Sequence, residues 1–302
     1  MIGHQEERTL IGKRVAWLAL ISNIILAVGK IVVGFFGHSE AVFADGIHSG
    51  ADVVASIAVL AVVGIANKPP DADHPFGHGK AEVISEGIVG IILFLVSVYI
   101  VVEAVMAFLG KPEVPDWIAM YAALISFASK LFLYRYSMEK GIRYRNKAII
   151  AIAYDHKGDI VASLAASIGV VFAILGEIFN LYYLLYADAV ASLIVAVLIF
   201  KFSAKLTGSS VNVLMEKNVE QEKLKKYLSI IRDYNEVKRI DQIRARDHGH
   251  YILLDLRLSF DYDLTIKQGH DIAREIKKEI QHQYPEVEEV FIHINPYFED
   301  EE

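Results

Sequence analysis

Cysteine is absent from the 302-residue sequence. Disulfide bonds and thiolate metal sites are therefore excluded, and any metal ion bound by this chain meets only nitrogen and oxygen ligands. No basic stripe with interleaved aromatic residues occurs, and the net charge of -7 disfavours nucleic acid as a partner. A nucleophile–base arrangement, a phosphate-binding loop and a GxGxxG motif are also missing, so the sequence does not indicate an enzyme.

Charged residues are scarce in the first two-thirds of the chain. Residues 1–208 contain 33 of the 67 charged residues, whereas residues 209–302 contain the other 34. Six apolar stretches of about 20 residues or more, long enough to cross a bilayer, lie at 11–36, 40–66, 82–109, 114–136, 147–175 and 181–204. We therefore expect a six-helix transmembrane domain in residues 1–208 and a separate, soluble domain in residues 209–302.

Lysine and arginine are unevenly distributed between the two ends of these stretches. The N-terminus, the second and fourth connecting loops and the exit from the last stretch contain twelve of them, whereas the other three loops contain only Lys111. By the positive-inside rule both termini face the cytoplasm, with lipid around the six helices. We expect an integral protein of a bacterial-type plasma membrane, with an internal membrane as the alternative.

The last third of the chain has the pattern of a small α/β domain. A helix is expected near 217–233, alternating strands at 237–246 and 251–260, a helix at 265–283 and a strand at 289–296. This αββαβ order is typical of a ferredoxin-like sheet with helices on one face.

Ionisable residues inside the apolar stretches form two clusters. Asp45, His48 and Asp52 lie three and four residues apart, so a helix places them on one face, and Asp155 and Asp159 lie one turn apart. A charge at mid-bilayer costs about 2.5–3.5 kcal/mol on insertion scales, so these groups need compensation. The two i,i+4 pairs suffice for a four-coordinate divalent cation site formed by His48, Asp52, Asp155 and Asp159. The alternative is that each is a structural polar group bonded to a neighbouring helix.

Basic residues also occur inside these stretches. We expect the lysines to extend to the membrane surface or to pair with acidic residues of other helices. The lysines are Lys30, Lys130 and Lys157, and the expected acidic partners are Glu86, Glu103 and Asp188. Asp188 opens the sixth stretch, where a carboxylate can cap the N-terminus of the helix.

The motifs HxxxD in the second stretch and DxxxD in the fifth resemble those of the cation diffusion facilitators, membrane antiporters that exchange divalent transition metals for protons. The flanking segments ADGIHSGADVVAS and DADHPFGHGKAE strengthen the resemblance, which covers essentially the whole chain. It implies a transport site at His48, Asp52, Asp155 and Asp159. Asp45, one turn before His48, is expected to support this site or guide the metal to it, with direct ligation as the alternative.

The ligand set bears on the choice of metal. Zinc-transporting relatives usually have a histidine at the position of Asp155, and this chain departs from that pattern. One imidazole with three carboxylates is a harder ligand set, which favours Mn²⁺. We expect Mn²⁺ as the substrate, with Zn²⁺, Fe²⁺, Co²⁺ and Cd²⁺ as alternatives.

The resemblance implies further sites outside the membrane. Asp71, His74 and His78 follow the second stretch at spacings of three and four residues, and the turn residues between them allow convergence on one ion; the alternative is a polar loop at the membrane surface. In the tail, the positions of the family's regulatory metal site are Asp241, Asp255, His270 and His293, with a solvated surface position as the alternative for Asp241. Lys80 and Glu216 match positions that form a charge lock between subunits in relatives.

These expectations combine into one function. The resemblance implies a homodimeric efflux transporter that exchanges cytoplasmic metal for protons, with residues 209–302 as its dimerisation and regulatory domain. A membrane metal sensor that signals through its tail without transport is the alternative, and a metal channel is a third possibility. Buried proton-binding ligands in one cage, rather than a continuous polar pore, favour the transporter.

Overall fold

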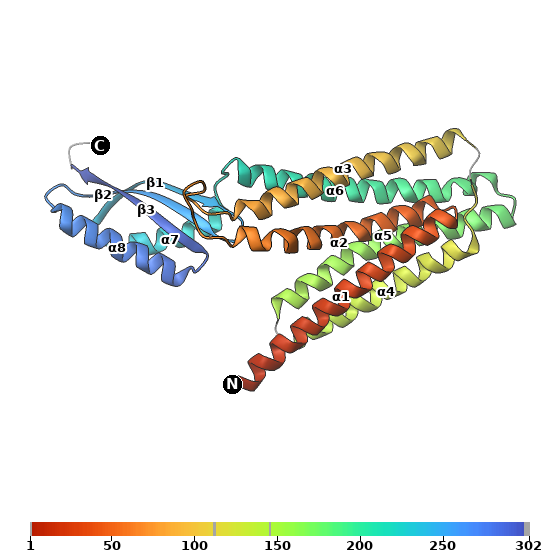
Figure 1. Cartoon of the computed structure of the whole chain (residues 1–302), viewed down its shortest axis with the longest axis horizontal. Helices are drawn as coiled ribbons and strands as arrows, with labels where there is room; N and C mark the ends of the chain where they lie inside the picture. Colours follow the sequence, from red (N-terminus) through yellow and green to blue (C-terminus); the bar gives the residue numbers. More distant parts are fainter. Residues whose placement is uncertain (1, 111–112, 145, 299–302) are drawn as a thin grey trace. The chain divides into compact units, whose positions relative to one another are not determined.

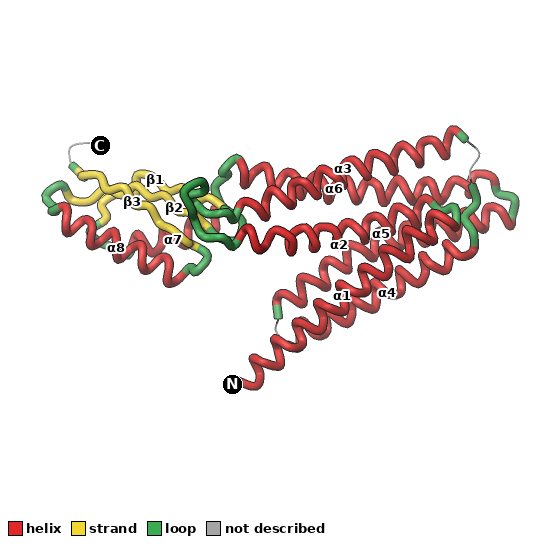
Figure 2. Tube along the Cα trace, in the orientation of Figure 1, coloured by secondary structure: helices red, strands yellow, loops and turns green. Residues whose placement is uncertain are grey.

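The computed structural model describes residues 2–110, 113–144 and 146–298, so Lys111 lies outside the described residues. The chain forms two compact units, one of residues 1–58 and 88–206 and the other of residues 59–87 and 207–302. Figure 1 follows the chain through both units, and Figure 2 shows the helices and strands; the strands of the described residues lie between Val237 and Tyr297.

Six long helices make up most of the described part of residues 2–214, and Figure 1 shows their course. They are α1 (Ile2–Phe36), α2 (Glu40–Ala66), α3 (Lys80–Leu109), α4 (Trp117–Arg143), α5 (Lys147–Ile178) and α6 (Ala187–Leu214), the last preceded by a 3-10 turn at Tyr182–Tyr186. Within the described residues, six helical segments are long and apolar enough to cross a membrane, which confirms the predicted spans. Their ends are less well predicted: α4 begins at Trp117 rather than 114, because Pro115 and the extended Asp116 precede it.

Small residues allow close contacts between the helices of the first unit. A Cβ added at Gly46 of α2 would collide with the backbone of Lys30 and Ile31 in α1. A Cβ at Gly169 of α5 would similarly collide with Ala191 of α6. Such approaches are typical of membrane helices, whose association depends on close packing rather than on the hydrophobic effect. The first contact places the C-terminal part of α1 directly against the acidic stretch of α2.

The tail contains two helices and a three-stranded sheet. Its elements are α7 (Gln221–Arg232), β1 (Val237–Asp247), β2 (Ile252–Asp261), α8 (Ile266–Gln283) and β3 (Val287–Tyr297). The strand order is β1-β2-β3, antiparallel between β1 and β2 and parallel between β2 and β3, so the predicted αββαβ order is confirmed. Helix α7 starts later than position 217, because Val219 already donates its N–H to the Ala245 carbonyl and Asn218 bridges to Arg246.

The tail has its own hydrophobic core. Alternate residues of β2 from Ile252 to Phe260 are buried, and they pack against apolar residues of both helices. The helix residues in this core are Leu224, Tyr227, Ile230, Ile231, Ile276 and Ile280. Thr265 begins α8 with a capping box to Gln268, which satisfies backbone donors at the helix start. Both helices therefore cover one face of the sheet, as expected for a domain with its own core.

Candidate metal centres

Helices α2 and α5 bring together residues of the two predicted ligand pairs. The Nε2 of His48 lies 3.8 Å from the Oδ1 of Asp159, and both side chains are largely buried. Asp52, one turn further along α2, also reaches the side chain of Asp159. Asp155, one turn before Asp159, is exposed, although its charge acts on both Asp52 and Asp159. The structure thus groups three of the four predicted ligands and leaves Asp155 at the exposed edge.

Two buried lysines pair with acidic residues of these clusters. The Nζ of Lys130 lies 2.6 Å from the Oδ2 of Asp159, and it donates a second hydrogen bond of 2.8 Å to Asn23. The Nζ of Lys30 lies 2.9 Å from the Oδ2 of Asp45. The expectation that these two lysines reach the surface or pair with Glu86, Glu103 or Asp188 was wrong. Each instead faces a carboxylate on the helix that follows it across a hairpin turn, whereas Lys157 is exposed.

Asp45 belongs to a buried polar network rather than to an open site. Its Oδ2 accepts hydrogen bonds from Ser163 of α5 at 2.9 Å and from Lys30, which also donates to Ser49. Ser163 in turn contacts Ser126 of α4 at 3.1 Å. The network links α1, α2, α4 and α5 around the acidic residues, so it fixes their relative positions.

A second imidazole lies beside Asp159. His156 is 1% exposed, and its Nδ1 lies 3.8 Å from the Oδ2 of Asp159. Neither ring nitrogen has a hydrogen-bond partner in the described part of the chain. Sequence reasoning missed this residue, although its spacing of three residues before Asp159 places both on one helix face.

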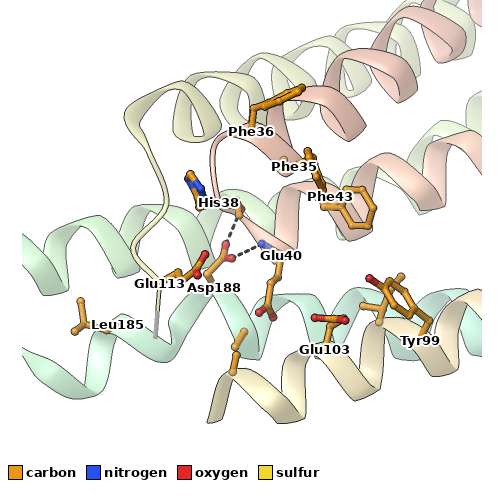
Figure 3. Close-up of a pocket in the computed structure, with 15 residues that line it drawn as sticks. Phe35, Phe36, His38, Glu40, Phe43, Tyr99, Glu103, Glu113, Leu185 and Asp188 are labelled. Carbon is orange, nitrogen blue, oxygen red and sulfur yellow. Dashed lines mark hydrogen bonds between the residues drawn. The ribbon is translucent and has the colours of Figure 1, made fainter. Parts of the chain in front are cut away.

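A cavity of about 540 Å³ lies in the first unit near the α1–α2 and α5–α6 turns (Figure 3). Its lining includes His38, Glu40, Glu103, Glu113 and Asp188, and it does not include the predicted transport ligands. Acidic side chains therefore gather at this end of the helices as well.

Asp188 has a different role from the one expected. Its carboxylate accepts hydrogen bonds from the Ser39 hydroxyl at 2.8 Å and from the backbone N–H of Ala41 at 3.3 Å. It also accepts one from the backbone N–H of Glu40 at 2.7 Å (Figure 3). Asp188 thus caps the N-terminus of α2, not that of its own helix. A carboxylate is favourable there because the first N–H groups of a helix lack partners within it.

The loop before α3 contains a compact set of potential metal ligands. One ligand atom each from Asp71, His74 and His78 lies within 4.8 Å of the other two, the one such group of three found among the described residues. Each imidazole has a nitrogen 3.4 Å from an Asp71 oxygen. The backbone N–H of His74 donates to Asp71 and holds the pKa of this carboxyl below its usual value. Gly77, with φ of +84°, allows the tight turn that returns His78 to the group.

Tail residues hold this loop in place within the second unit. The hydroxyl of Tyr251 donates to the Phe76 carbonyl, and the guanidinium of Arg246 lies 5.9 Å from the centre of the Phe76 ring. Lys80 donates to Glu216 at 3.1 Å, and this hydrogen bond together with Arg246 lowers the pKa of Glu216. The predicted lock residues are therefore paired within one chain.

The four predicted tail ligands are not gathered at one point of a single chain. Asp241 accepts hydrogen bonds from Arg239, Ser259 and Asn295, which lower its pKa although burial opposes this. Each of the other three has different surroundings: Asp255 pairs with Arg246 at 2.8 Å, His270 contacts Arg274 at 3.0 Å, and His293 is exposed on β3. Both carboxylates therefore already have cationic partners.

Comparison with known proteins identifies the family. Residues 16–215 match the family described as the cation efflux transmembrane domain, and residues 219–297 match the cation efflux protein cytoplasmic domain. The manganese efflux system protein MneP of Bacillus subtilis (strain 168) is 65% identical over 294 residues, which cover 97% of this chain and 99% of MneP. The magnetosome protein MamB of Magnetospira sp. (strain QH-2) is 32% identical over 283 residues, 93% of this chain and 94% of MamB. The manganese efflux system protein MneS of Bacillus subtilis (strain 168) is 30% identical over 286 residues, 94% and 96% of the two chains.

These matches extend over both parts of the chain, and the six apolar helices agree with them. The chain is therefore an integral membrane protein that belongs to the cation efflux family, the cation diffusion facilitators, whose members are transporters.

Proposed function

We propose that this protein exports divalent transition metal from the cytoplasm, with Mn²⁺ as the preferred substrate, in exchange for protons. The observation that carries the proposal is the meeting of His48 and Asp159 across α2 and α5 inside an apolar helix bundle. Similarity to MneP, whose name specifies manganese efflux, supports the choice of metal.

His48, Asp52, Asp155 and Asp159 are the proposed transport ligands. Carboxylates are hard oxygen donors, and a set dominated by them suits Mn²⁺ better than Zn²⁺. Zn²⁺, Fe²⁺, Co²⁺ and Cd²⁺ are the competing substrates. Asp45 is proposed to support the site through its buried hydrogen-bond network with Ser163 and Lys30 rather than by ligation.

Proton exchange is proposed on the chemistry of the ligands. A divalent cation binds carboxylate and neutral imidazole groups, so its binding releases any protons that these groups carry. Metal and protons then occupy the site alternately, which couples their opposite movements across the membrane. Transport requires alternating access, in which the helices that carry the ligands move against the others.

The regions outside the membrane are proposed to regulate transport. Asp71, His74 and His78 form a second metal site, while residues 209–302 form a domain that joins two copies of the chain and responds to metal. The proposed tail ligands are Asp241, Asp255, His270 and His293. Before they bind metal, the two carboxylates must release their present partners, Arg239 and Arg246. Lys80 and Glu216 are proposed to form the charge lock between subunits. Both termini are proposed to lie in the cytoplasm.

Transport by purified protein in proteoliposomes tests the proposal. A metal gradient of Mn²⁺, Zn²⁺, Fe²⁺, Co²⁺ or Cd²⁺ is applied, and metal and proton movement are recorded together. The expected result is Mn²⁺ flux accompanied by proton flux in the opposite direction. Binding of Mn²⁺ without flux of either ion would instead favour the membrane metal sensor, and flux without protons would contradict antiport.

A further inference from the structure

Lys130 is a fully buried cation at the centre of α4. It lies equally far from Trp117 and Arg143 at the helix ends, and its side chain is 0% exposed. A lysine at that depth is tolerated when an anion or a strong acceptor accepts hydrogen bonds from its ammonium group. Asp159 at 2.6 Å and Asn23 at 2.8 Å supply these two acceptors.

The ammonium of Lys130 lies on one of the two oxygens through which Asp159 can bind a transported metal. Asp159 has two carboxylate oxygens, of which Oδ1 faces His48 and Oδ2 is taken by Lys130. Two cations cannot share such a contact without strong repulsion, because a unit charge and a divalent ion a few ångströms apart interact strongly at low effective dielectric. Full coordination of a metal by Asp159 therefore requires the ammonium of Lys130 to withdraw.

Asn23 gives the displaced ammonium a place to remain. Its side-chain oxygen already accepts a hydrogen bond from Lys130, and it lies on α1 rather than among the proposed ligands. The lysine side chain is long and flexible, so a small rotation can loosen the contact with Asp159 while the contact with Asn23 persists. No new acceptor has to be found in the apolar interior.

The net charge of the whole cluster also indicates that Lys130 opposes metal binding. In the deprotonated form that binds metal, the four carboxylates of Asp45, Asp52, Asp155 and Asp159 and the two ammonium groups of Lys30 and Lys130 leave a net charge equal and opposite to that of one divalent cation. Without Lys130 the net charge of the cluster is more negative. One divalent cation then no longer neutralises the cluster, and the cluster attracts the metal more strongly.

We propose that Lys130 is a built-in competing cation, which occupies Asp159, withdraws towards Asn23 when metal binds and returns to promote metal release. The proposal rests on the proposed function, since it assumes that Asp159 binds the transported ion. Lys130 thereby weakens metal binding and accelerates turnover, because affinity differences among related sites reside mainly in the dissociation rate.

The test uses full-length protein with three substitutions. Lys130→Met removes the charge and keeps the side-chain volume, Lys130→Arg keeps a cation, and Asn23→Leu removes the alternative acceptor. Lys157→Met is the matched control, because Lys157 is exposed on α5 two residues before Asp159. Equilibrium Mn²⁺ binding is measured in a His78→Asn, His293→Asn background that silences the proposed loop and tail sites, and KM and kcat for Mn²⁺ are measured in proteoliposomes.

The two key substitutions are expected to act in opposite directions. Lys130→Met should tighten Mn²⁺ binding about tenfold or more and lower kcat, whereas Asn23→Leu should weaken binding. Lys130→Arg should restore values close to wild type, and Lys157→Met should change neither. A merely structural role predicts weaker binding and lower activity in both Lys130→Met and Asn23→Leu.

Each outcome decides between the alternatives. Unchanged or weaker binding in folded Lys130→Met overturns the competition, and so does unchanged or tighter binding in Asn23→Leu. If Lys130→Met does not fold, Lys130→Gln replaces it, because glutamine removes the charge and keeps a hydrogen-bond donor; competition predicts tighter Mn²⁺ binding in this variant, and a merely structural role predicts weaker binding. Failure of the proposed function is distinguishable, because wild-type protein would then show no Mn²⁺ flux in the same vesicles.

Discussion

The imidazole of His48 and the carboxylate of Asp159 face each other across α2 and α5, with 3.8 Å between Nε2 and Oδ1. The same carboxylate holds the ammonium of Lys130 on its other side. Asp159 therefore joins three helices, and its contacts have consequences for stability as well as for metal binding.

Removal of Asp159 should destabilise the protein more than removal of its neighbour Asp155. Asp159→Ala leaves the Lys130 ammonium buried beside Asn23 alone, and breaking a buried ion pair in this way costs about 3–5 kcal/mol. Asp155→Ala, whose carboxylate is exposed, should change the free energy of unfolding by only about 0.5 kcal/mol. Unfolding in detergent, followed by circular dichroism, measures both.

The double variant Lys130→Met with Asp159→Ala provides the control for this prediction. It removes both charges, so it should recover much of the stability lost in Asp159→Ala while remaining inactive. Equal unfolding free energies for Asp159→Ala and wild type would show that the Lys130–Asp159 pair contributes nothing to the fold.

Asp155→His should shift metal preference from Mn²⁺ towards Zn²⁺. The substitution replaces a carboxylate by an imidazole, and nitrogen-rich sites suit Zn²⁺ better than Mn²⁺. Overall activity should fall but persist. Competition uptake of the two metals by vesicles measures the ratio, with Asp155→Asn as the control for loss of charge. An unchanged ratio in Asp155→His would place selectivity elsewhere, and the buried imidazole of His156 is then the next residue to test.

Asp188 should govern the stability of the start of α2. Asp188→Ala leaves the Ser39 hydroxyl and two backbone N–H groups without their acceptor, at a cost of about 1–3 kcal/mol. Hydrogen–deuterium exchange of residues 40–44 should accelerate, and Asp188→Asn, which retains one acceptor oxygen, should have a smaller effect. Exchange at the wild-type rate in Asp188→Ala would rule out this cap.

His248 should make the second unit sensitive to acid. Burial lowers the pKa of His248 below its ordinary value, and the described contacts leave both ring nitrogens without hydrogen-bond partners. The unfolded chain then binds more protons than the folded chain as the pH falls below about 6.5, so stability decreases from there down to the folded pKa.

His248→Phe should abolish this acid-dependent loss, because phenylalanine keeps the aromatic contact with Tyr251 and cannot be protonated. His282→Phe, at an exposed position of α8, is the matched control and should keep the wild-type pH profile. Thermal unfolding of full-length protein between about pH 5 and 8 compares the three. Parallel profiles for wild type and His248→Phe would contradict the prediction.

The six spans were predictable because a bilayer demands about 20 apolar residues in every crossing helix. The partners of Lys30 and Lys130 do not follow from the pattern of any single span, and the acidic residues expected to pair with them lie on other helices. In an antiparallel helical hairpin, residues equally far from the turn lie side by side. Lys30 and Asp45 are almost equally far from the turn at residues 37–39. Lys130 and Asp159 are almost equally far from Arg143 and Lys147, where α4 ends and α5 begins. The distance of each residue from the hairpin turn therefore predicts both lysine–carboxylate pairs.

Other features depended on contacts between distant segments. Asp188 and Ser39 are joined by the packing of α6 against α2, which no local pattern in either segment indicates. The proposed tail ligands share a sheet and a helix, yet arginines from neighbouring positions occupy Asp241 and Asp255. By contrast, Asp71, His74 and His78 converge as their spacing suggests, because one short turn controls all three.

Mn²⁺ uptake by proteoliposomes containing Asp52→Asn tests the account most directly. This substitution removes one proposed ligand without breaking the Lys130–Asp159 pair, so the fold should be preserved. The account predicts an initial rate below about a tenth of that of wild-type protein reconstituted at the same density, since metal binding requires the complete ligand set. A folded Asp52→Asn protein that transports Mn²⁺ at the wild-type rate would contradict it.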